Sequence, residues 1–301
     1  MSSDRPEISA VIISYNGMTF LPDCLRTLSE ELRGLTHEII VVDNGSRDGS
    51  PEFVERTYPR VTLIRNASNL GFARAVNQGF ERGKGEYYYI LNQDLRFGHG
   101  ATARLLERIR QDDTIGMIGP KFIYFGGGTQ RSVRSFPTYR HVLYRALFLD
   151  RVFPDHPTFG SWRMGFFDHE TEAFVDQPMG AVMLIPRRVV DDIGMMDERF
   201  PILFNDVDFC RRLADAGYKR LYYPDAVVEH YVGASTSTMP VRIRIISHTS
   251  MYRYMRKYAR PIELPLLWLC GALLMISIPI SIAVNQTRRK LTAAISSFSR
   301  R

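Results

Sequence analysis

Cysteine is scarce in this chain of 301 residues, and so are recurring sequence units. The three cysteines, Cys24, Cys210 and Cys270, are far apart and form no Cys-x-x-Cys pair. This pattern argues against a disulfide framework or a cysteine zinc site and favours a reducing compartment. The sequence also has no low-complexity tract and no internal repeat, which argues against a repeat architecture.

An apolar signal-peptide core is lacking as well, because acidic and polar residues precede Ile8. We therefore expect the main body of the protein to be cytoplasmic. Acidic residues are nearly absent from the C-terminal part: residues 230–301 hold eleven Lys and Arg against one acid, Glu263, which gives this part a charge of +10. The whole chain has a net charge of +7. Residues 1–229 carry the difference, −3. The basic charge thus predicts contact of the tail with an anionic membrane surface and not a nucleic-acid-binding core.

Strand-like and helix-like segments alternate through the first part of the chain. The strand-like runs end in turn residues, and the segments between them have apolar residues at helical spacing. The predicted strands are 8–14, 38–42, 61–65 and 86–92. Three predicted helices have their apolar faces within 21–32, 73–80 and 101–109, and Ser50-Pro51 predicts the start of a further helix between the second and third strands. This order predicts an α/β fold, a Rossmann-like and mostly parallel sheet with helices on both faces.

The middle of the chain is less regular. We predict two strands at 115–119 and 122–125, then a loop or lid over 131–170, because that segment is rich in Arg, Phe, Pro and His without a clear period. A third strand is expected over 174–185. The remaining expected elements are a helix at 206–216 and a short last strand at 227–230.

A hydrophobic segment lies near the C-terminus. Leu264–Val284 comprises 21 residues without a charge, long enough to cross a bilayer. Basic residues flank it on both sides, so the sequence gives no orientation, and Pro265 and Pro279 near its ends also suit an interfacial segment. The segment predicts membrane association by spanning or by lying in the interface. A helix used for homo-oligomerisation is the alternative.

Acidic residues or a histidine stand at or near four predicted element ends: Asp43, Asp94, Asp206 and His230. Open α/β sheets bind ligands beyond the carboxyl ends of their strands. An oxygen ligand there, on Mg²⁺ or Mn²⁺, would hold a nucleotide diphosphate. Taken singly, each residue has a simpler explanation: a turn-forming carboxylate for Asp43 and Asp94, a helix-start carboxylate for Asp206 and a core histidine for His230.

The short sequence motifs around these residues are more specific. In this order and spacing they resemble the family 2 inverting glycosyltransferases of the GT-A fold, and within them the bacterial rhamnosyltransferase branch. The resemblance covers about residues 8–232. It is carried by Val42-Asp43-Asn44-Gly45-Ser46, Asp48-Gly49-Ser50, Asn69-Leu70-Gly71-Phe72-Ala73, Asn92-Gln93-Asp94, Asn205-Asp206-Val207-Asp208 and Glu229-His230, with support from Arg131–Pro137, Gly180-Ala181 and Met196–Phe200.

The resemblance implies a donor site and a metal site. Asp94 matches the last Asp of the family's Asp-x-Asp metal motif, in which Asn92 takes the first position, and His230 matches a later histidine ligand. One imidazole and one carboxylate suit Mg²⁺ or Mn²⁺. The residues that would bind the nucleotide-sugar donor are Ser14, Tyr15, Asn16, Asp43, Gly71, Arg74, Asn77, Asn92, Gln93, Gly180 and Ala181.

The catalytic base implied by the resemblance is Asp206, which matches the Asp of the family's Glu-Asp motif with Asn205 in place of the Glu. A carboxylate there can take the proton of an acceptor hydroxyl as it attacks the sugar. Asp208 is the reserve, but two residues along a helix place it about 200° around the axis. Both carboxylates therefore cannot face the sugar.

These expectations define a membrane-associated transferase at the cytoplasmic face of the plasma membrane. Residues 1–239 would form the catalytic domain and 240–301 a basic extension containing the apolar helix 264–284. The resemblance implies transfer of L-rhamnose from dTDP-rhamnose to a polyprenyl-diphosphate-linked or polysaccharide acceptor. A UDP-sugar donor and a non-catalytic scaffold that binds nucleotide-sugars are the alternatives.

Overall fold

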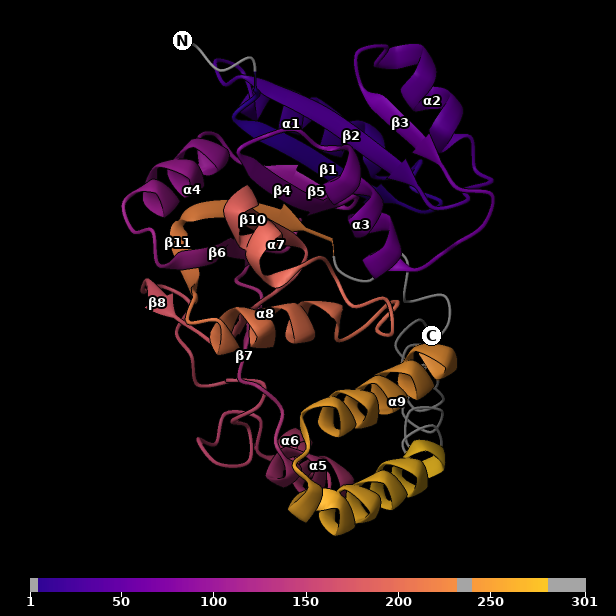
Figure 1. The fold of residues 1–301 in the computed structure, drawn as a ribbon, viewed down its shortest axis with the longest axis vertical. Helices are drawn as coiled ribbons and strands as arrows, with labels where there is room; N and C mark the ends of the chain where they lie inside the picture. Colours follow the sequence, from indigo (N-terminus) through magenta and orange to yellow (C-terminus); the bar gives the residue numbers. More distant parts are fainter. Residues whose placement is uncertain (1–4, 232–239, 281–301) are drawn as a thin grey trace, which may run out of the picture.

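The fold is built on one mixed central sheet covered by helices on both faces (Figure 1). A computed structural model describes residues 5–231 and 240–280. The end of the predicted apolar segment, 281–284, lies outside the described residues. The strands of the sheet follow the order β3-β2-β1-β4-β10-β6-β11-β5, with β8 paired to β11 and a separate pair β7-β9.

The predicted α/β class is confirmed, and the first half of the sheet, β3-β2-β1-β4, is parallel as expected. The strands are β1 (Ile8–Ser14), β2 (His37–Asp43), β3 (Thr62–Arg65), β4 (Tyr87–Asn92), β5 (Leu95–Phe97), β6 (Ile115–Ile123), β7 (Val133–Arg134), β8 (Ala173–Phe174), β9 (Gln177–Pro178), β10 (Val182–Pro186) and β11 (Lys219–His230). The helices are α1 (Leu21–Glu31), α2 (Ser50–Thr57), α3 (Phe72–Arg82), α4 (Ala101–Arg110), α5 (Tyr139–Ala146), α6 (Leu149–Val152), α7 (Arg187–Ile193), α8 (Asn205–Asp215) and α9 (Pro240–Tyr258), with a short 3-10 turn at Pro261–Glu263.

Two apolar clusters, one on each face, hold the sheet between its helices. Ile8, Ala10 and Ile12 of β1 pack with α1, α2 and α4, whereas Val11 and Ile13 of the same strand pack with α3, α7 and α8. Successive residues of a strand point to opposite faces, so a strand covered on both faces is apolar throughout. This is why β1 is a continuous apolar run in the sequence.

The second half of the sheet differs from the prediction. β10 lies between β4 and β6 and is antiparallel to both. The single strand expected at 174–185 is divided into β8, β9 and β10, and the two strands expected at 115–125 are one strand, β6, which continues through Pro120. β11 is longer than its expected four residues, because a register shift between Tyr223 and Val227 lets the strand pass Pro224.

Segment 131–170 is not only a loop. It forms β7, α5 and α6, and it packs with α9 and an apolar helix over Pro261–Ile280 below the sheet (Figure 1). A third apolar cluster joins these parts through Val142, Trp162, Phe204, Tyr254 and Leu267. The sequence pattern was weak here because the segment buries its large side chains against the C-terminal helices and not against the sheet.

Candidate active site

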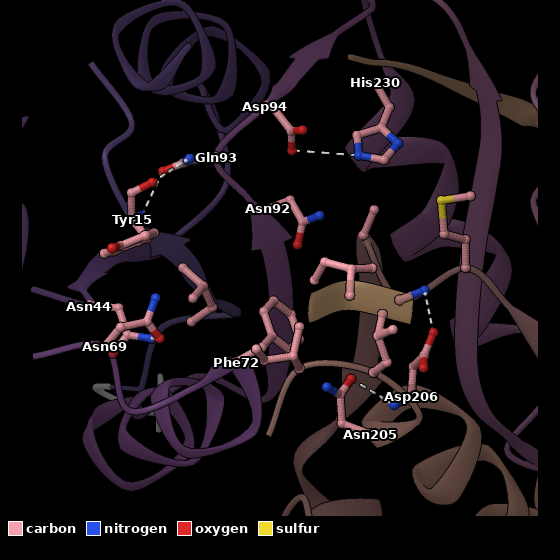
Figure 2. A pocket seen from close by; sticks show the side chains of 17 residues that line it. Tyr15, Asn44, Asn69, Phe72, Asn92, Gln93, Asp94, Asn205, Asp206 and His230 are labelled. Carbon is pink, nitrogen blue, oxygen red and sulfur yellow. Dashed lines mark hydrogen bonds and ion pairs between the residues drawn. The ribbon is translucent and has the colours of Figure 1, made fainter. Parts of the chain in front are cut away.

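A cavity of about 320 Å³ opens beyond the carboxyl ends of β1, β2 and β4 (Figure 2). This is the position where open α/β sheets bind ligands. Its lining comes from the strand ends, from the loop before α8 and from α9. The lining residues are Ile13, Tyr15, Asn44, Asn69, Phe72, Asn92, Gln93, Asp94, Met179, Gly180, Ala181, Ile202, Leu203, Asn205, Asp206, His230 and Ile243.

One end of the cavity is fixed by the side chain of Gln93. Its Oε1 accepts hydrogen bonds from Ser14 Oγ, 2.9 Å away, and from the Tyr15 backbone N–H, 2.8 Å away. Its Nε2 donates to the Tyr15 carbonyl at 3.0 Å. β1 and β4 are neighbours in the sheet, so this amide locks their two ends together. Gln93 and Tyr15 line the cavity, while Ser14 is buried behind them.

Asp43 lies at the end of β2 and is almost completely buried. Its Oδ2 accepts hydrogen bonds from the backbone N–H groups of Gly45 and Ser46 at 3.2 and 3.1 Å. Its Oδ1 is buried with no hydrogen-bond partner among the described residues. A buried acceptor without a donor is costly, and a donor group of a ligand would satisfy it.

Asp94 and His230 face one another across the upper wall of the cavity in Figure 2, with Asp94 Oδ1 3.5 Å from His230 Nε2. Both side chains are largely buried. Gln130 orients the histidine: its Nε2 donates to the carbonyls of Ile123 and His230, which leaves its Oε1 3.2 Å from His230 Nδ1. Since Oε1 only accepts, Nδ1 carries the hydrogen. In the neutral imidazole, which is the form that binds a metal, Nε2 then presents its lone pair toward the carboxylate.

Two acceptors that face each other at this distance fit a cation between them. One carboxylate and one neutral imidazole are ligands that suit Mn²⁺ or Mg²⁺, with diphosphate oxygens of a donor as the remaining ligands. Within residues 5–231 and 240–280, no group of three His, Cys, Asp or Glu gathers as a metal site. Asn92 lines the cavity beside Asp94 but adds no charge. The protein therefore offers two of the ligands that a divalent cation needs.

Asp206 lines the opposite wall, at the first turn of α8. Its Oδ2 accepts hydrogen bonds from Gln177 Nε2 at 2.6 Å and from the Gly180 backbone N–H at 3.3 Å, and its Oδ1 accepts from the Val207 N–H at 2.9 Å. Burial raises the pKa of the Asp206 carboxyl above its ordinary value, against the effect of these hydrogen bonds. A carboxylate with raised proton affinity at a cavity wall suits a general base.

Asp208 points away from the cavity. It is completely buried and is bound by Lys257 Nζ at 2.5 Å, Tyr258 Oη at 2.8 Å and Arg212 Nε at 3.1 Å. Lys257 and Tyr258 belong to α9, so this carboxylate joins α8 to α9. With its oxygens bound by cations and a hydroxyl, the reserve base is in a structural position.

Several predicted donor-binding residues lie outside the cavity wall. Arg74 and Asn77 on α3 bind the segment after α7: Arg74 contacts Glu198 at 3.4 Å, and Asn77 exchanges hydrogen bonds with the backbone of Met196. Gly71 has φ +90°, and a Cβ there would lie 2.7 Å from the Pro201 carbonyl oxygen. Its close approach is thus to a loop of the protein. Asn16 is exposed and bonds to Ser46 and Arg47.

The cavity wall also contains residues that the sequence did not single out. Asn44 and Asn69 join two loops by a 3.1 Å hydrogen bond. Both belong to the sequence motifs around Asp43 and Gly71 that carry the family resemblance. Asn205 accepts from the Asp206 N–H and donates to the Phe200 carbonyl, which a glutamate could not do. Behind the wall, Gln130 and Gln177 bind His230 and Asp206, and neither had a sequence signal because these partners are distant in the chain.

The fold can be compared with those of solved structures. A solved mannosyltransferase, PcManGT from Pyrobaculum calidifontis in complex with GDP-Man and Mn²⁺, has the same fold. It aligns with a TM-score of 0.58 at 19% identity and covers 97% of this chain and 76% of its own. The architecture is accordingly the GT-A fold.

The chain belongs to glycosyl transferase family 2, whose family model matches residues 9–171. The predicted family is thereby confirmed. The N-acetylglucosaminyl-diphospho-decaprenol L-rhamnosyltransferase of Mycobacterium tuberculosis is 28% identical over 228 residues, 72% of this chain and 74% of that protein. The undecaprenyl-phosphate 4-deoxy-4-formamido-L-arabinose transferase of Pseudomonas aeruginosa is 37% identical over 120 residues, 37% of this chain and 35% of that protein.

Proposed function

We propose that this enzyme transfers a sugar from a nucleoside diphosphate donor to a hydroxyl of a polyprenyl-diphosphate-linked acceptor at a membrane surface, with inversion at the anomeric carbon. The donor we propose is dTDP-L-rhamnose. The observation that carries the reaction is the placement of Asp206 on one wall of the cavity, opposite Asp94 and His230. The acceptor class and the sugar are supported by the likeness to the mycobacterial rhamnosyltransferase.

In the proposed step, the acceptor oxygen attacks the anomeric carbon while Asp206 takes the hydroxyl proton. The new bond is from that oxygen to the anomeric carbon, and the bond from this carbon to the diphosphate oxygen breaks. The nucleoside diphosphate leaves with the electron pair. Asp94 and His230 would hold a divalent cation, which supplies positive charge to offset that of the departing diphosphate.

The nucleoside would lie at the other end of the cavity, beside Tyr15, Asn44 and Asn69. The unpaired Oδ1 of Asp43 behind this end is suited to accept an N–H of the base or a ribose O–H. Gly180 and Ala181 would lie beside the sugar, next to Asp206. We retain Ser14 and Gln93 as the residues that shape the nucleotide end. Asn16, Gly71, Arg74 and Asn77 would act only through the loops that they hold.

The membrane-facing part would be the C-terminal extension. Among the residues that the structure covers, Pro261–Ile280 is one helix long and apolar enough to cross a membrane by length and composition. One side of it packs on the protein through Leu267, Cys270 and Leu274, while Ile262 and Trp268 are exposed. This two-sided character favours a helix lying in the membrane interface at the cytoplasmic leaflet.

Calorimetric titration with dTDP, UDP and GDP, with and without Mn²⁺, tests the donor. We expect metal-dependent binding of dTDP, weakened about tenfold or more in Asp94→Asn because one metal ligand loses its charge. A preference for UDP would instead indicate a UDP-sugar donor and overturn the rhamnose proposal.

Product formation tests the chemistry. Asp206→Asn is expected to lower kcat by at least about a hundredfold while donor binding is retained, because only the proton acceptor is removed. Asp113→Asn, an exposed carboxylate on the loop after α4, is the control and should leave kcat unchanged. Nucleotide binding by the wild type without product formation would favour the non-catalytic scaffold.

A further inference from the structure

A group of arginines around Trp162 lies next to the catalytic wall and takes no part in the mechanism above. We call Arg134, Arg145, Arg163 and Arg244 the Trp162 cation cluster. Arg134 Cζ lies 5.6 Å and Arg145 Cζ 5.3 Å from the centroid of the Trp162 ring. The ring also packs on Phe204, two residues before Asp206, with centroids 6.4 Å apart. The cluster is therefore attached to the start of α8.

Positive charge in this cluster exceeds the negative charge around it. Asp150 is the buried counterion, and its Oδ2 lies 3.7 Å from Arg163 Nε, beyond hydrogen-bond distance. Asp206 supplies further negative charge at the edge of the cluster, near Arg134. Within residues 5–231 and 240–280, the four guanidinium groups thus have two neighbouring carboxylates, Asp150 and Asp206, and Asp206 is the proposed catalytic base.

Donor atoms in the cluster are left without partners. Arg145 Nε and Trp162 Nε1 are buried with no hydrogen-bond acceptor among the described residues. In the same described part of the chain, no hydrogen bond or ion pair engages the guanidinium groups of Arg134 and Arg244. Half-buried cations usually have a counterion, and unpaired buried donors are costly. Both oxygens of Asp150 also lack a hydrogen-bond donor among the described residues. An anion would supply acceptors to Arg145 Nε and Trp162 Nε1 and a counterion to Arg134 and Arg244.

The proton affinities agree with this geometry. Burial, together with repulsion from Arg163, lowers the pKa of Arg145 to about 10, so its guanidinium remains charged at neutral pH. Burial and the neighbouring Arg145 lower the pKa of His248 on α9 to about 4. The positive potential of the cluster therefore extends onto α9, between the cavity and the apolar helix.

We propose that the Trp162 cation cluster binds the diphosphate of the lipid-linked acceptor, which rests on the proposed function and assigns its acceptor site. The planar guanidinium groups match phosphate oxygens with two parallel hydrogen bonds. Trp162 packs on Phe204, two residues before Asp206, so the cluster lies on the side of the catalytic carboxylate where an acceptor sugar would join its hydroxyl to the diphosphate. Leu147, Val152 and Phe153 are exposed on and beside α5 and α6, where they offer the polyprenyl chain an apolar surface next to the cluster.

Farnesyl diphosphate is the probe, with farnesol as its neutral counterpart, titrated into the full-length protein in EDTA so that no metal at Asp94 and His230 binds the diphosphate. The wild type should bind farnesyl diphosphate about tenfold or more tightly than farnesol. Arg145→Gln and Arg163→Gln should each lose most of this preference. Farnesol binding should stay the same, which separates loss of the anion site from misfolding.

Arg140→Gln is the matched control, because Arg140 lies on the same helix α5 as Arg145 but is exposed and outside the cluster. It should keep the preference of the wild type. An equal loss in Arg140→Gln, or none in the cluster variants, would overturn the proposal. The proposal would also be overturned if the cluster variants bound phosphatidylglycerol vesicles more weakly but bound farnesyl diphosphate as the wild type does. That result would assign the cluster to a phospholipid headgroup.

The two proposals fail separately in this design. Farnesyl diphosphate binding needs neither donor nor turnover, so it tests the cluster even if the wild type transfers no sugar. Conversely, product formation by the wild type with an unchanged KM for a diphosphate-linked acceptor in Arg145→Gln would leave the transferase intact and reject the acceptor site. In the supporting case, that KM rises about tenfold while the KM for the donor does not change.

Discussion

At the scale of single residues, the site depends on polar atoms that the protein leaves incompletely satisfied. Asp43 Oδ1 has no partner among the described residues, and Asp94 and His230 present two acceptors to each other. Such deficits cost stability, and they persist where a ligand can remove them. These incompletely hydrogen-bonded atoms therefore lie where the donor and its cation are proposed to bind.

The raised pKa of Asp206 gives a stability prediction. Because its folded-state pKa lies above the unfolded value, the folded protein binds the proton more tightly, and the wild type loses stability as pH rises through the interval between the two pKa values. Asp206→Asn has no such proton. The Tm of the variant minus that of the wild type should thus be more positive at pH 7 than at pH 3.5. Calorimetry at both pH values checks this, and a difference independent of pH would contradict it.

At the scale of elements, the contact between α8 and α9 positions the catalytic carboxylate. Asp208 on α8 is bound by Lys257 and Tyr258 of α9, and Lys257 also contacts Asp197 at 2.8 Å. Phe204, which precedes α8, has φ 72°, a left-handed conformation that is strained for a non-glycine residue. Its packing on Trp162 and Tyr254 holds it there. The start of α8 is therefore held by α9 and by segment 131–170.

Lys257→Met should destabilise the protein by about 1–3 kcal/mol, because the buried Asp208 loses one cation and keeps only Arg212 and the Tyr258 hydroxyl. Arg256→Met, the exposed neighbour on the same helix, should change stability by no more than about 0.5 kcal/mol. Urea denaturation measures both. Equal losses of stability in the two variants would show that the positive charge of α9, and not the contact between Lys257 and Asp208, stabilises the protein.

At the scale of the whole molecule, the C-terminal helices are part of the folded body. Met251, Tyr254 and Met255 of α9 share an apolar cluster with Phe200 and residues of the apolar helix. Gly271 of that helix lies so close to Tyr252 that a Cβ there would be 2.8 Å from the ring. The division into residues 1–239 and 240–301 stays a proposal about role. Removing residues 240–301 would expose the cluster and would test folding as much as membrane binding.

Substitutions on the exposed side of the apolar helix separate the two effects. A protein with Trp268→Ser, Leu269→Gln and Ile276→Gln, all at exposed positions, should keep its Tm within a few degrees and bind phosphatidylglycerol vesicles about tenfold more weakly, because apolar area for the membrane is lost. Co-sedimentation with vesicles measures the binding. Unchanged binding would reject this face as the membrane contact.

The sequence by itself determined the fold class, the family and the order of the residues at the strand ends. Buried parallel strands must be continuously apolar, and the polar residues that follow them, such as Asp43 and Asp94, must meet at one edge of the sheet. These relations are local, so the pattern carries them. The helical spacing of α8 likewise determined that Asp206 and Asp208 point in different directions.

Only the tertiary structure decided which of these two carboxylates faces the cavity, and that Gly71, Arg74 and Asn77 hold loops. It also decided that Gln130 and Gln177 orient His230 and Asp206, and that Arg134 and Arg145 meet at Trp162. The physical reason is the same in each case. Side-chain hydrogen bonds and cation–aromatic contacts join residues that are distant along the chain, and no period or spacing in the sequence records which of them become neighbours.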